Sequence, residues 1–315
     1  MRLLPVLLAS LLFTAGAQAQ GVIRIVVPFA AGGVQDIVAR SFNNELGTLL
    51  GRSVIVENRA GAGGTIGTGS VAKSAPDGQT LILSAASHTI AGSLYARLPY
   101  DPIADFTGVA HIGSVDYVLL ISTTIPPRNV QELLEYGKKN PGKLNYASAG
   151  NGSATHLSMA YFAALGGLEM VHVPFKATGE AVNEVLAGRA HAVIAANIGA
   201  IPYLKDGRVR ALASTGTRRS KFLPPDLPTV AESGVPGYAF DSWIALLAPA
   251  ATPRPLVEAV NAAVDKLLRD ATILERLARQ GVEPRAMPPE ALNTLLREDF
   301  QRMARVVKAS GARID

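Results

Sequence analysis

The sequence predicts an α/β protein built as two lobes with a ligand cleft between them. The chain has 315 residues, more than the usual single-domain range of about 100 to 200. Short β-rich runs alternate with helical patterns along most of it, which is typical of parallel sheets. These elements form two clusters that join near residues 120–125 and again near 240. A chain that leaves one lobe, builds a second and returns makes a hinge, and the cleft beside a hinge is a natural ligand site.

The first cluster begins with three short apolar runs, which predict strands, and two segments with apolar residues at helical spacing. The strands are expected at Ile23–Pro28, Ser53–Glu57 and Thr80–Ser84, and the helices at Asp36–Leu50 and Ile66–Lys73. A further strand is expected at Tyr117–Ser122, after which Pro126 and Pro127 open a new region.

The second cluster repeats this alternation, and the chain then returns through a turn-rich connection rich in proline and glycine. Its helices are expected at Val130–Asn140, His156–Leu165 and Glu180–Leu186, and its strands at Leu144–Ser148, Met170–Pro174, His191–Ala196 and Arg208–Ala213. The return comprises a strand at Trp243–Ala248 and helices at Pro255–Arg269, Ile273–Gln280 and Pro289–Lys308. We therefore expect residues 20–122 and 243–315 to form lobe 1, and residues 123–242 to form lobe 2.

The first nineteen residues have the pattern of a cleavable secretory signal peptide. Arg2 precedes a largely apolar run of eleven residues, and the segment ends in the small-x-small sequence Ala17-Gln18-Ala19. Eleven residues are too few to cross about 30 Å of hydrocarbon as a helix. The prediction is export to the periplasm, with a mature chain that starts at Gln20.

Composition excludes several classes of function. The chain has no Cys, which removes disulfides, Cys-ligated metals and thiol nucleophiles. The formal charge is only +5 and aromatic residues are 6% of the chain, so a nucleic-acid partner is not expected. The five His residues include no pair at metal-ligand helical spacing, so neither a metal nor a cofactor is expected.

The first of three candidate motifs follows the first strand and reads PFAAGGVQD, residues 28–36. Gly32 and Gly33 free backbone N–H groups, and the start of the next helix adds partial positive charge, so a carboxylate is the expected guest. The alternative is that the glycines only make a tight turn and Asp36 only caps the helix. The residues alone favour neither interpretation.

The second motif, residues 58–67, reads NRAGAGGTIG and resembles a dinucleotide loop in its glycine spacing. It does not follow the first strand, however, and no acidic residue stands about 20 residues further on to bind a ribose. A nucleotide site is therefore disfavoured.

The third motif, residues 146–156, reads YASAGNGSATH and is again a strand-to-helix turn. Gly150 and Gly152 free the backbone, while Ser153 and Thr155 offer hydroxyls, with Ser153 as the expected N-cap. Two such turns, one per lobe, could hold the two ends of a dicarboxylate.

Catalysis is not expected, because the usual activating constellations are missing. The sequence lacks a G-x-S-x-G elbow, H-E-x-x-H and a P-loop. Ser153 and His156 are three residues apart on one helix, which is a loose match to Ser–His chemistry at best.

Seven stretches, in order along the mature chain, together resemble one family. They are VPFAAGGVQDIVAR, VIVENRAGAGGTIG, APDGQTL, YDPIADFTGVA, NPGKLNYASAGNGSATHL, HVPFKATGEAVNEVLAG and LPTVAESGVPGYAFDSWIALLAPAATP. The chain is thus similar to the Bug family of periplasmic solute-binding proteins, the receptors of tripartite tricarboxylate transporters. The resemblance implies a type II periplasmic-binding-protein fold that closes on a small mono- or dicarboxylate.

The resemblance also implies which residues bind the ligand. In lobe 1 they are Phe29, Ala30, Ala31, Gly32, Gly33, Asp36, Ser84, Ala86 and Ser87. In lobe 2 they are Asn151, Gly152, Ser153, Thr155, Pro174, Phe175, Lys176 and Asn197. His156 is expected to be structural.

One departure from the family bears on the ligand. The family commonly has an acidic residue near the end of the strand that here reads HAVIAAN, where this chain has Ala195, Ala196 and Asn197. An acidic side chain there could pair with an ammonium group, so its replacement favours a plain carboxylate over an amino acid. The expected partners are membrane permease subunits, or alternatively a sensor kinase, and the receptor itself is expected to be a monomer.

Overall fold

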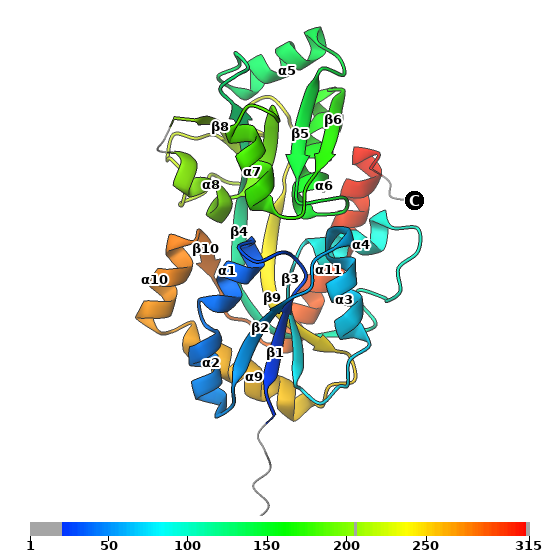
Figure 1. Ribbon diagram of the computed structural model, residues 1–315, viewed down its shortest axis with the longest axis vertical. Coiled ribbons are helices and arrows are strands. Elements are labelled where there is room, and N and C mark those ends of the chain that lie inside the picture. Colours follow the sequence, from blue (N-terminus) through cyan, green and yellow to red (C-terminus); the bar gives the residue numbers. More distant parts are fainter. Residues whose placement is uncertain (1–20, 205–206, 313–315) are drawn as a thin grey trace, which may run out of the picture.

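The computed structural model describes residues 21–204 and 207–312, and it shows two lobes stacked along the long axis (Figure 1). The predicted signal peptide, residues 1–19, lies outside the described residues. Below, "lower lobe" and "upper lobe" refer to the two halves as drawn in Figure 1, and they correspond to the predicted lobe 1 and lobe 2. In the part of the chain that the structure describes, no helix combines the length and the apolar character that a membrane crossing requires.

The lower lobe starts with parallel strands and the helices that connect them. Its first elements are β1 (Ile23–Val27), α1 (Val34–Arg40), α2 (Asn43–Leu50), β2 (Val54–Asn58), the 3-10 helix η1 (Ala62–Gly64), α3 (Thr65–Ala72), β3 (Thr80–Ala85) and α4 (Ser87–Leu94). β1 lies between β2 and β3 and is parallel to both. Most aliphatic side chains of β1 and β3 are buried, as in a sheet covered on both faces, whereas β2 at the edge exposes Ile55.

The upper lobe repeats this construction. It contains α5 (Val130–Lys139), β5 (Leu144–Ser148), α6 (Ala154–Gly166), β6 (Met170–Pro174), α7 (Thr178–Leu186), β7 (Ala192–Ala196), α8 (Asn197–Leu204) and β8 (Val209–Ser214). The chain then returns to the lower lobe with β9 (Asp241–Pro249), α9 (Arg254–Leu267), α10 (Ala271–Arg279), β10 (Val282–Pro284) and α11 (Pro289–Ser310).

One long strand, β4 (Phe106–Ser122), passes through both lobes. Its residues 106–116 pair antiparallel with β9, and its residues 117–121 pair antiparallel with β7. The chain therefore passes from one set of strands to the other at Asp116–Tyr117, and it returns at Phe240–Asp241, where β9 begins. The strand order is β2-β1-β3-β9-β4-β7-β5-β6, with β8 and β10 both paired to β4.

Most predicted elements match the structure to within about two residues at each end, and two differ by more. The single helix expected at Asp36–Leu50 is two helices, because Phe42 between them has a φ of −140° and buries its ring. Arg276 of α10 donates to the carbonyl of Ser41 at this break, 3.1 Å away. The strand expected to begin at Tyr117 begins at Phe106 instead, and register shifts near Gly108 and Gly113 interrupt its first half.

Candidate functional site

A cavity of about 30 Å³ lies between the two lobes, and ligand pockets occur preferentially at such interfaces between domains. Lower-lobe residues on its wall are Phe29, Gly33, Val34, Gln35, Ala85, Ser87, Val115, Ser242 and Ile244. Upper-lobe residues on its wall are Tyr117, Ala149, Ser153, Ala154, Thr155, Ala177, Thr178 and Ala196. Each lobe supplies about half of the wall, and no Lys, Arg, His, Asp or Glu is among these residues.

Four helices begin at this wall: α1, α4, α6 and α7. Each of them follows a strand (β1, β3, β5 or β6), so the cavity lies at the carboxyl ends of these strands, where open α/β sheets bind ligands. The N-cap residues of α1, α4 and α7 are Gly33, Ala86 and Ala177, and none of the three forms a side-chain capping bond. The first-turn N–H groups of these helices therefore have no side-chain cap, and their dipoles favour a negative charge.

The loop before α6 is organised by two hydroxyl groups. Ser153 is the N-cap, as predicted, because its Oγ accepts a hydrogen bond of 3.2 Å from the N–H of His156. The Oγ1 of Thr155 accepts from the N–H of Ala149 at 2.8 Å and lies 2.9 Å from the Oγ of Ser153. Both side chains line the cavity while they also fix the loop, so capping and a place at the site coexist.

Two stacked imidazoles support this loop from behind. The rings of His156 and His172 lie 4.1 Å apart, and Tyr146 stacks on both. The Nδ1 of His156 accepts from the N–H of Gly152 at 3.2 Å, and the Nε2 of His172 is 2.6 Å from the Oγ of Ser148. Burial lowers the pKa of His156 to about 4, and burial together with the charge of His156 lowers that of His172 to about 3. Both rings are neutral at pH 7, and His156 does not line the cavity.

The loop after β1 is held by a carboxylate that points into the protein. Asp36 accepts from the N–H of Gly32 at 2.9 Å and from the Nε of Arg40 at 2.9 Å, and its side chain is buried. The carboxylate thus fixes the turn and does not line the cavity. Gly32 has a φ of +80°, which this turn requires and which glycine adopts without strain.

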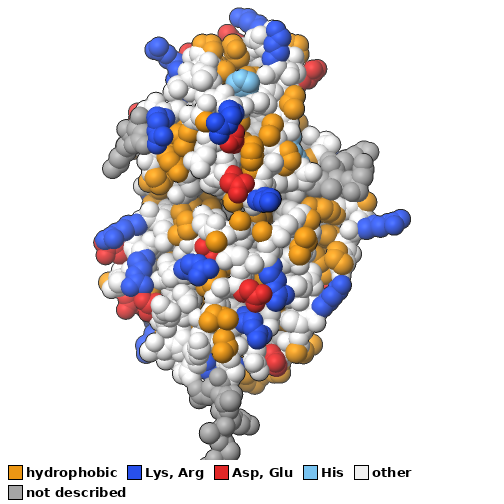
Figure 2. Space-filling model, viewed as in Figure 1, with side chains coloured by type: hydrophobic (Ala, Val, Ile, Leu, Met, Phe, Trp, Pro, Cys, Tyr) orange, Lys and Arg blue, Asp and Glu red, His pale blue; other side chains and the backbone are white. Residues whose placement is uncertain are grey.

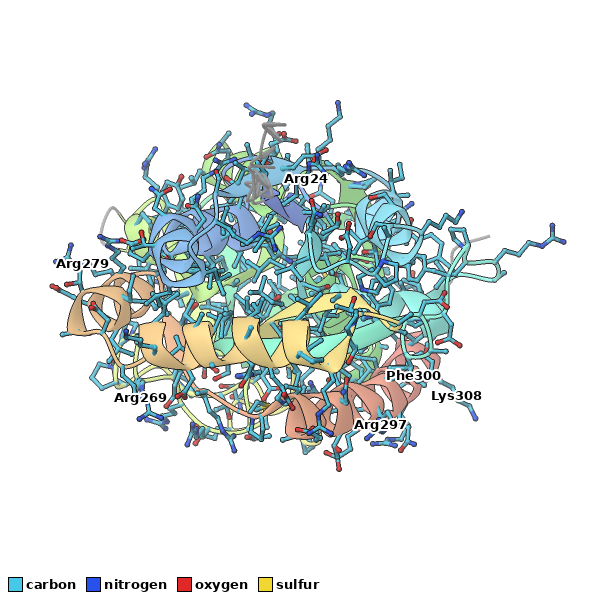
Figure 3. All side chains as sticks on the ribbon, turned by 90° about the horizontal axis from the view of Figure 1, so that it is seen from below. Arg24, Arg269, Arg279, Arg297, Phe300 and Lys308 are labelled. Atoms are coloured by element: carbon cyan, nitrogen blue, oxygen red, sulfur yellow. The ribbon has the colours of Figure 1, made fainter. Side chains whose placement is uncertain are left out.

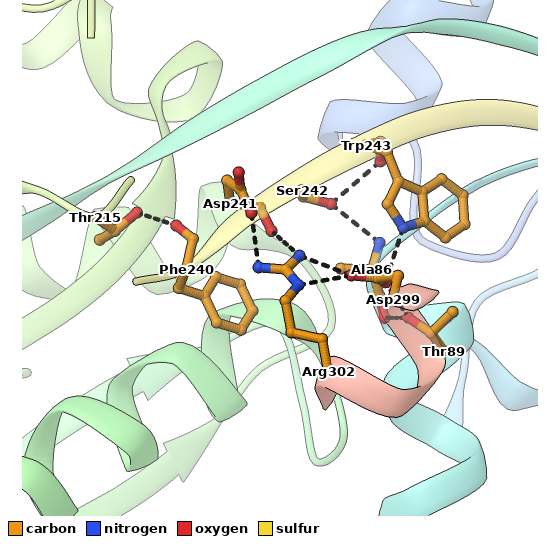
Figure 4. Close-up of polar contacts among 9 residues, drawn as sticks. All are labelled: Ala86, Thr89, Thr215, Phe240, Asp241, Ser242, Trp243, Asp299 and Arg302. Carbon is orange, nitrogen blue, oxygen red and sulfur yellow. Dashed lines mark hydrogen bonds and ion pairs between the residues drawn. The ribbon is translucent and has the colours of Figure 1, made fainter. Parts of the chain in front are cut away.

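The wall contributed by β9 rests on a buried polar cluster (Figure 4). Ser242, which lines the cavity, accepts from the N–H of Ala86 at 3.0 Å. Asp299 of α11 accepts from the Oγ1 of Thr89 at 2.6 Å and from the Nε1 of Trp243 at 2.8 Å. Arg302 of the same helix donates to Asp299 and to Asp241, both at 2.7 Å. The cluster ties α11 and α4 to the point where the chain re-enters the lower lobe.

No charged side chain is among the residues that line the cavity. On the face drawn in Figure 2, hydrophobic atoms occur along the band between the lobes together with an acidic and a basic side chain, and other Lys and Arg side chains are scattered over the rest of the surface. Viewed from below, Arg269, Arg279, Arg297 and Lys308 lie near the edge of the molecule (Figure 3). Among the described residues, no group of three or more acidic or His side chains could hold a metal ion.

Five of the predicted site residues line the cavity: Phe29, Gly33, Ser87, Ser153 and Thr155. Others stand next to it in the same loops: Ala30, Ala31, Gly32, Asp36, Ala86, Asn151 and Gly152. Ser84 is replaced on the wall by Ala85, because successive strand residues face opposite sides of a sheet. After β6 the wall is formed by Ala177 and Thr178, and not by the predicted residues just before them, Pro174, Phe175 and Lys176.

Asn197 lies on another contact between the lobes. Its side chain is fully buried, donates to the carbonyl of Gly281 at 2.9 Å and accepts from the N–H of Ile198 at 2.8 Å. Ala196, one residue earlier, lines the cavity instead. Sequence reasoning also missed Tyr117 and Ser242, which lie where the chain crosses between the lobes.

The arrangement is that of a two-lobed periplasmic binding protein. The solved structure of the periplasmic binding protein BugD superposes with a TM-score of 0.87 at 34% identity, covering 93% of this chain and 99% of that one. Residues 38–312 match the family described as "Tripartite tricarboxylate transporter family receptor". The chain belongs to this family, the receptors of tripartite tricarboxylate transporters that include the Bug proteins.

Two further solved structures of similar proteins contain carboxylates. One is Rpa4515 of R. palustris with adipate, with a TM-score of 0.88, 32% identity, and coverage of 94% of this chain and 100% of that one. The other is MatC (Rpa3494) from Rhodopseudomonas palustris with bound malate, with a TM-score of 0.85, 35% identity, and coverage of 91% and 98%.

Proposed function

We propose that this solute-binding receptor captures a small mono- or dicarboxylate in the cavity between its lobes and delivers it to a tripartite tricarboxylate transporter permease. The observation that carries the proposal is the convergence of four helix N-termini on one cavity whose wall has no acidic side chain. Such N-termini bind carboxylates through backbone N–H groups and need no countercharge. The adipate and malate found in similar proteins support this ligand class.

The binding energy required is within reach of such a wall. A micromolar dissociation constant corresponds to about 8 kcal/mol. Hydrogen bonds to a charged group contribute roughly 1.5–3 kcal/mol each, so four to six donors could offset the costs of ordering and closure. Besides first-turn N–H groups, the wall offers the hydroxyls of Ser87, Ser153, Thr155 and Thr178. The Ala, Val, Ile and Phe side chains between them suit the carbon skeleton of the solute.

In this proposal the hinge lies at the crossings Asp116–Tyr117 and Phe240–Asp241, where the strand pairing passes from one lobe to the other. Thr215 joins them, because its Oγ1 lies 3.1 Å from the carbonyl of Tyr117 and 2.6 Å from that of Phe240. With this hinge, residues up to 116 and from 241 would move together against residues 117–240. α11 packs on α4 of the lower lobe and on α6 of the upper lobe, so closure would also change the α11–α6 contact. Export by the predicted signal peptide would bring the receptor to the periplasm, where it meets both solute and permease.

The proposal is tested by a thermal-shift panel of mono- and dicarboxylates, with amino acids and sugars alongside. A ligand at 100 times its dissociation constant stabilises the folded state by about 2.7 kcal/mol, which is a readily measured shift. Stabilisation by amino acids or sugars, with none by carboxylates, would overturn the ligand assignment.

A charged substitution at Gly33 tests where the ligand binds. The φ of Gly33 is −73°, which suits any residue, and a Cβ added there would lie 3.1 Å from the carbonyl oxygen of Ala30. Gly33→Asp places a negative charge at the cavity wall, while Gly33→Asn adds the same shape without charge. We expect Asp to abolish carboxylate binding and Asn to weaken it far less. Equal affinity in the two variants would contradict an anion site at this turn. Gly152 is less suitable, because its φ of +78° strains any other residue.

A further inference from the structure

The glycine-rich segment 58–67, which follows β2, contributes nothing to the cavity wall but reaches the upper lobe. Gly63 in η1 has a φ of +63°, and a Cβ built on it would lie 2.1 Å from the carbonyl oxygen of Asn151. That distance is far inside van der Waals contact, so only glycine permits this approach. The space that a phosphate would need at Gly63 is occupied by the Asn151 backbone, which disfavours a nucleotide loop here.

A tyrosine hydroxyl joins the same two backbone segments. The Oη of Tyr95, at the C-terminal end of α4, lies 2.8 Å from the carbonyl oxygen of Ala62 and 3.1 Å from that of Asn151. The hydroxyl has one proton, so the two carbonyls share a single donor. Burial raises the pKa of Tyr95, so the hydroxyl keeps this proton at neutral pH.

The backbone is strained where it meets the tyrosine. Ala62 has a φ of +45°, and in the parts of the chain described, 21–204 and 207–312, no other residue except glycine has a positive φ. Such a conformation persists only where surrounding contacts hold it. Here the Ala62 carbonyl accepts from Tyr95 and also from the Oγ1 of Thr65 at 2.9 Å.

We propose that Tyr95, Ala62, Gly63 and Asn151, here called the Tyr95 bridge, form a latch that holds the lobes together around the bound solute and so sets its affinity and release rate. Asn151 belongs to the β5–α6 loop that also presents Ser153 and Thr155 to the cavity. The bridge therefore connects lobe closure directly to the position of a binding loop. Tyr95 itself does not line the cavity, so it is a positioning residue that acts through the Asn151 loop. The inference rests on the proposed function for its ligand.

The tyrosine is tested by Tyr95→Phe, which removes the hydroxyl and keeps the ring. Tyr161→Phe is the matched control, because the Tyr161 hydroxyl also donates to a carbonyl, that of Gly237 at 3.2 Å, within the upper lobe. Removing one such hydrogen bond from the closed form is expected to weaken adipate binding about two- to tenfold, mostly through faster dissociation. Tyr161→Phe should leave adipate binding unchanged. Equal binding by Tyr95→Phe and the wild type would overturn the latch.

The close approach is tested by Gly63→Ala against Gly142→Ala. Both glycines have a positive φ, +63° and +70°, so both variants carry similar backbone strain. A Cβ at Gly142 meets nothing within 4 Å, whereas a Cβ at Gly63 collides with Asn151. We expect Gly63→Ala to lower adipate affinity at least about tenfold while its thermal stability matches that of Gly142→Ala. Equal adipate affinity in the two variants would contradict the proposal.

A distance measurement separates this inference from the proposed function. The chain has no Cys, so spin labels can be placed at two introduced cysteines, Lys73→Cys on the lower lobe and Lys139→Cys on the upper lobe. Pulsed electron paramagnetic resonance would then report the lobe separation with or without adipate. Tyr95→Phe and Gly63→Ala should shift the distribution toward longer distances even without ligand. If adipate fails to bind the wild type but the distances shift, the latch stands and the ligand assignment fails. Unchanged distances would overturn the latch.

Discussion

The stacked imidazoles behind the β5–α6 loop should make the stability of the protein depend on pH. His156 has a pKa of about 4 in the folded protein, lowered by burial from its ordinary value of 6.5. Between pH 6.5 and pH 4 the unfolded chain therefore binds a proton that the folded chain does not. The free energy of unfolding must then fall as the pH falls through this window. For His156 alone, the loss between pH 7 and pH 5 is about 2 kcal/mol.

Replacing this histidine by a neutral residue removes that dependence. In His156→Asn the side-chain oxygen can still accept from the N–H of Gly152, which the imidazole Nδ1 now does. Urea denaturation at pH 7, 6 and 5 measures the free energy of unfolding of both proteins. Between pH 7 and pH 5, the difference between them should shift by about 2 kcal/mol in favour of the variant. Tyr146→Phe is the control, since it keeps a ring in the stack and should retain the wild-type dependence. A constant difference between His156→Asn and wild type across this range would refute the reasoning.

Two further substitutions test the supports of the site. Ser153→Ala removes the N-cap of α6 and should lower the free energy of unfolding by about 1 kcal/mol while weakening carboxylate binding. Calorimetric titration that finds full affinity would show that this hydroxyl has no part in the site. Asp299→Asn removes the charge that faces Arg302 and should destabilise the protein by about 2–4 kcal/mol in chemical denaturation. A loss well under 1 kcal/mol would contradict a structural role for the cluster.

The strands were largely predictable from sequence because their signal is local. Runs such as IRIVV and TLILSA are apolar, short and bounded by turn residues, and they form β1 and β3 nearly as expected. The helix α4 was not predicted, because SHTIAGSL is buried on nearly all sides and shows no amphipathic pattern. The first half of β4 was missed for a related reason, since its glycines and bulges break the apolar run.

The site was predictable where a turn and a helix start coincide in the sequence. Ser153 and Thr155 stand in such a turn, and both reach the cavity. Residues such as Tyr117 and Ser242 reach the cavity because β4 and β9, which are far apart in sequence, pair at the crossing between the lobes. No local sequence pattern indicates that pairing. The shift from Ser84 to Ala85 is a matter of one residue in strand register, which the sequence pattern of a fully buried strand does not specify.

Calorimetric titration of the chain from Gln20 onward with adipate, and in parallel with its uncharged diamide, tests the central claim most directly. The two compounds have the same carbon skeleton, so their difference isolates the carboxylates. A cavity wall of helix N-termini and hydroxyls predicts saturable binding of adipate or of another small carboxylate, and at least about tenfold weaker binding of the matching amide. Equal affinity for acid and amide would contradict an anion site between the lobes.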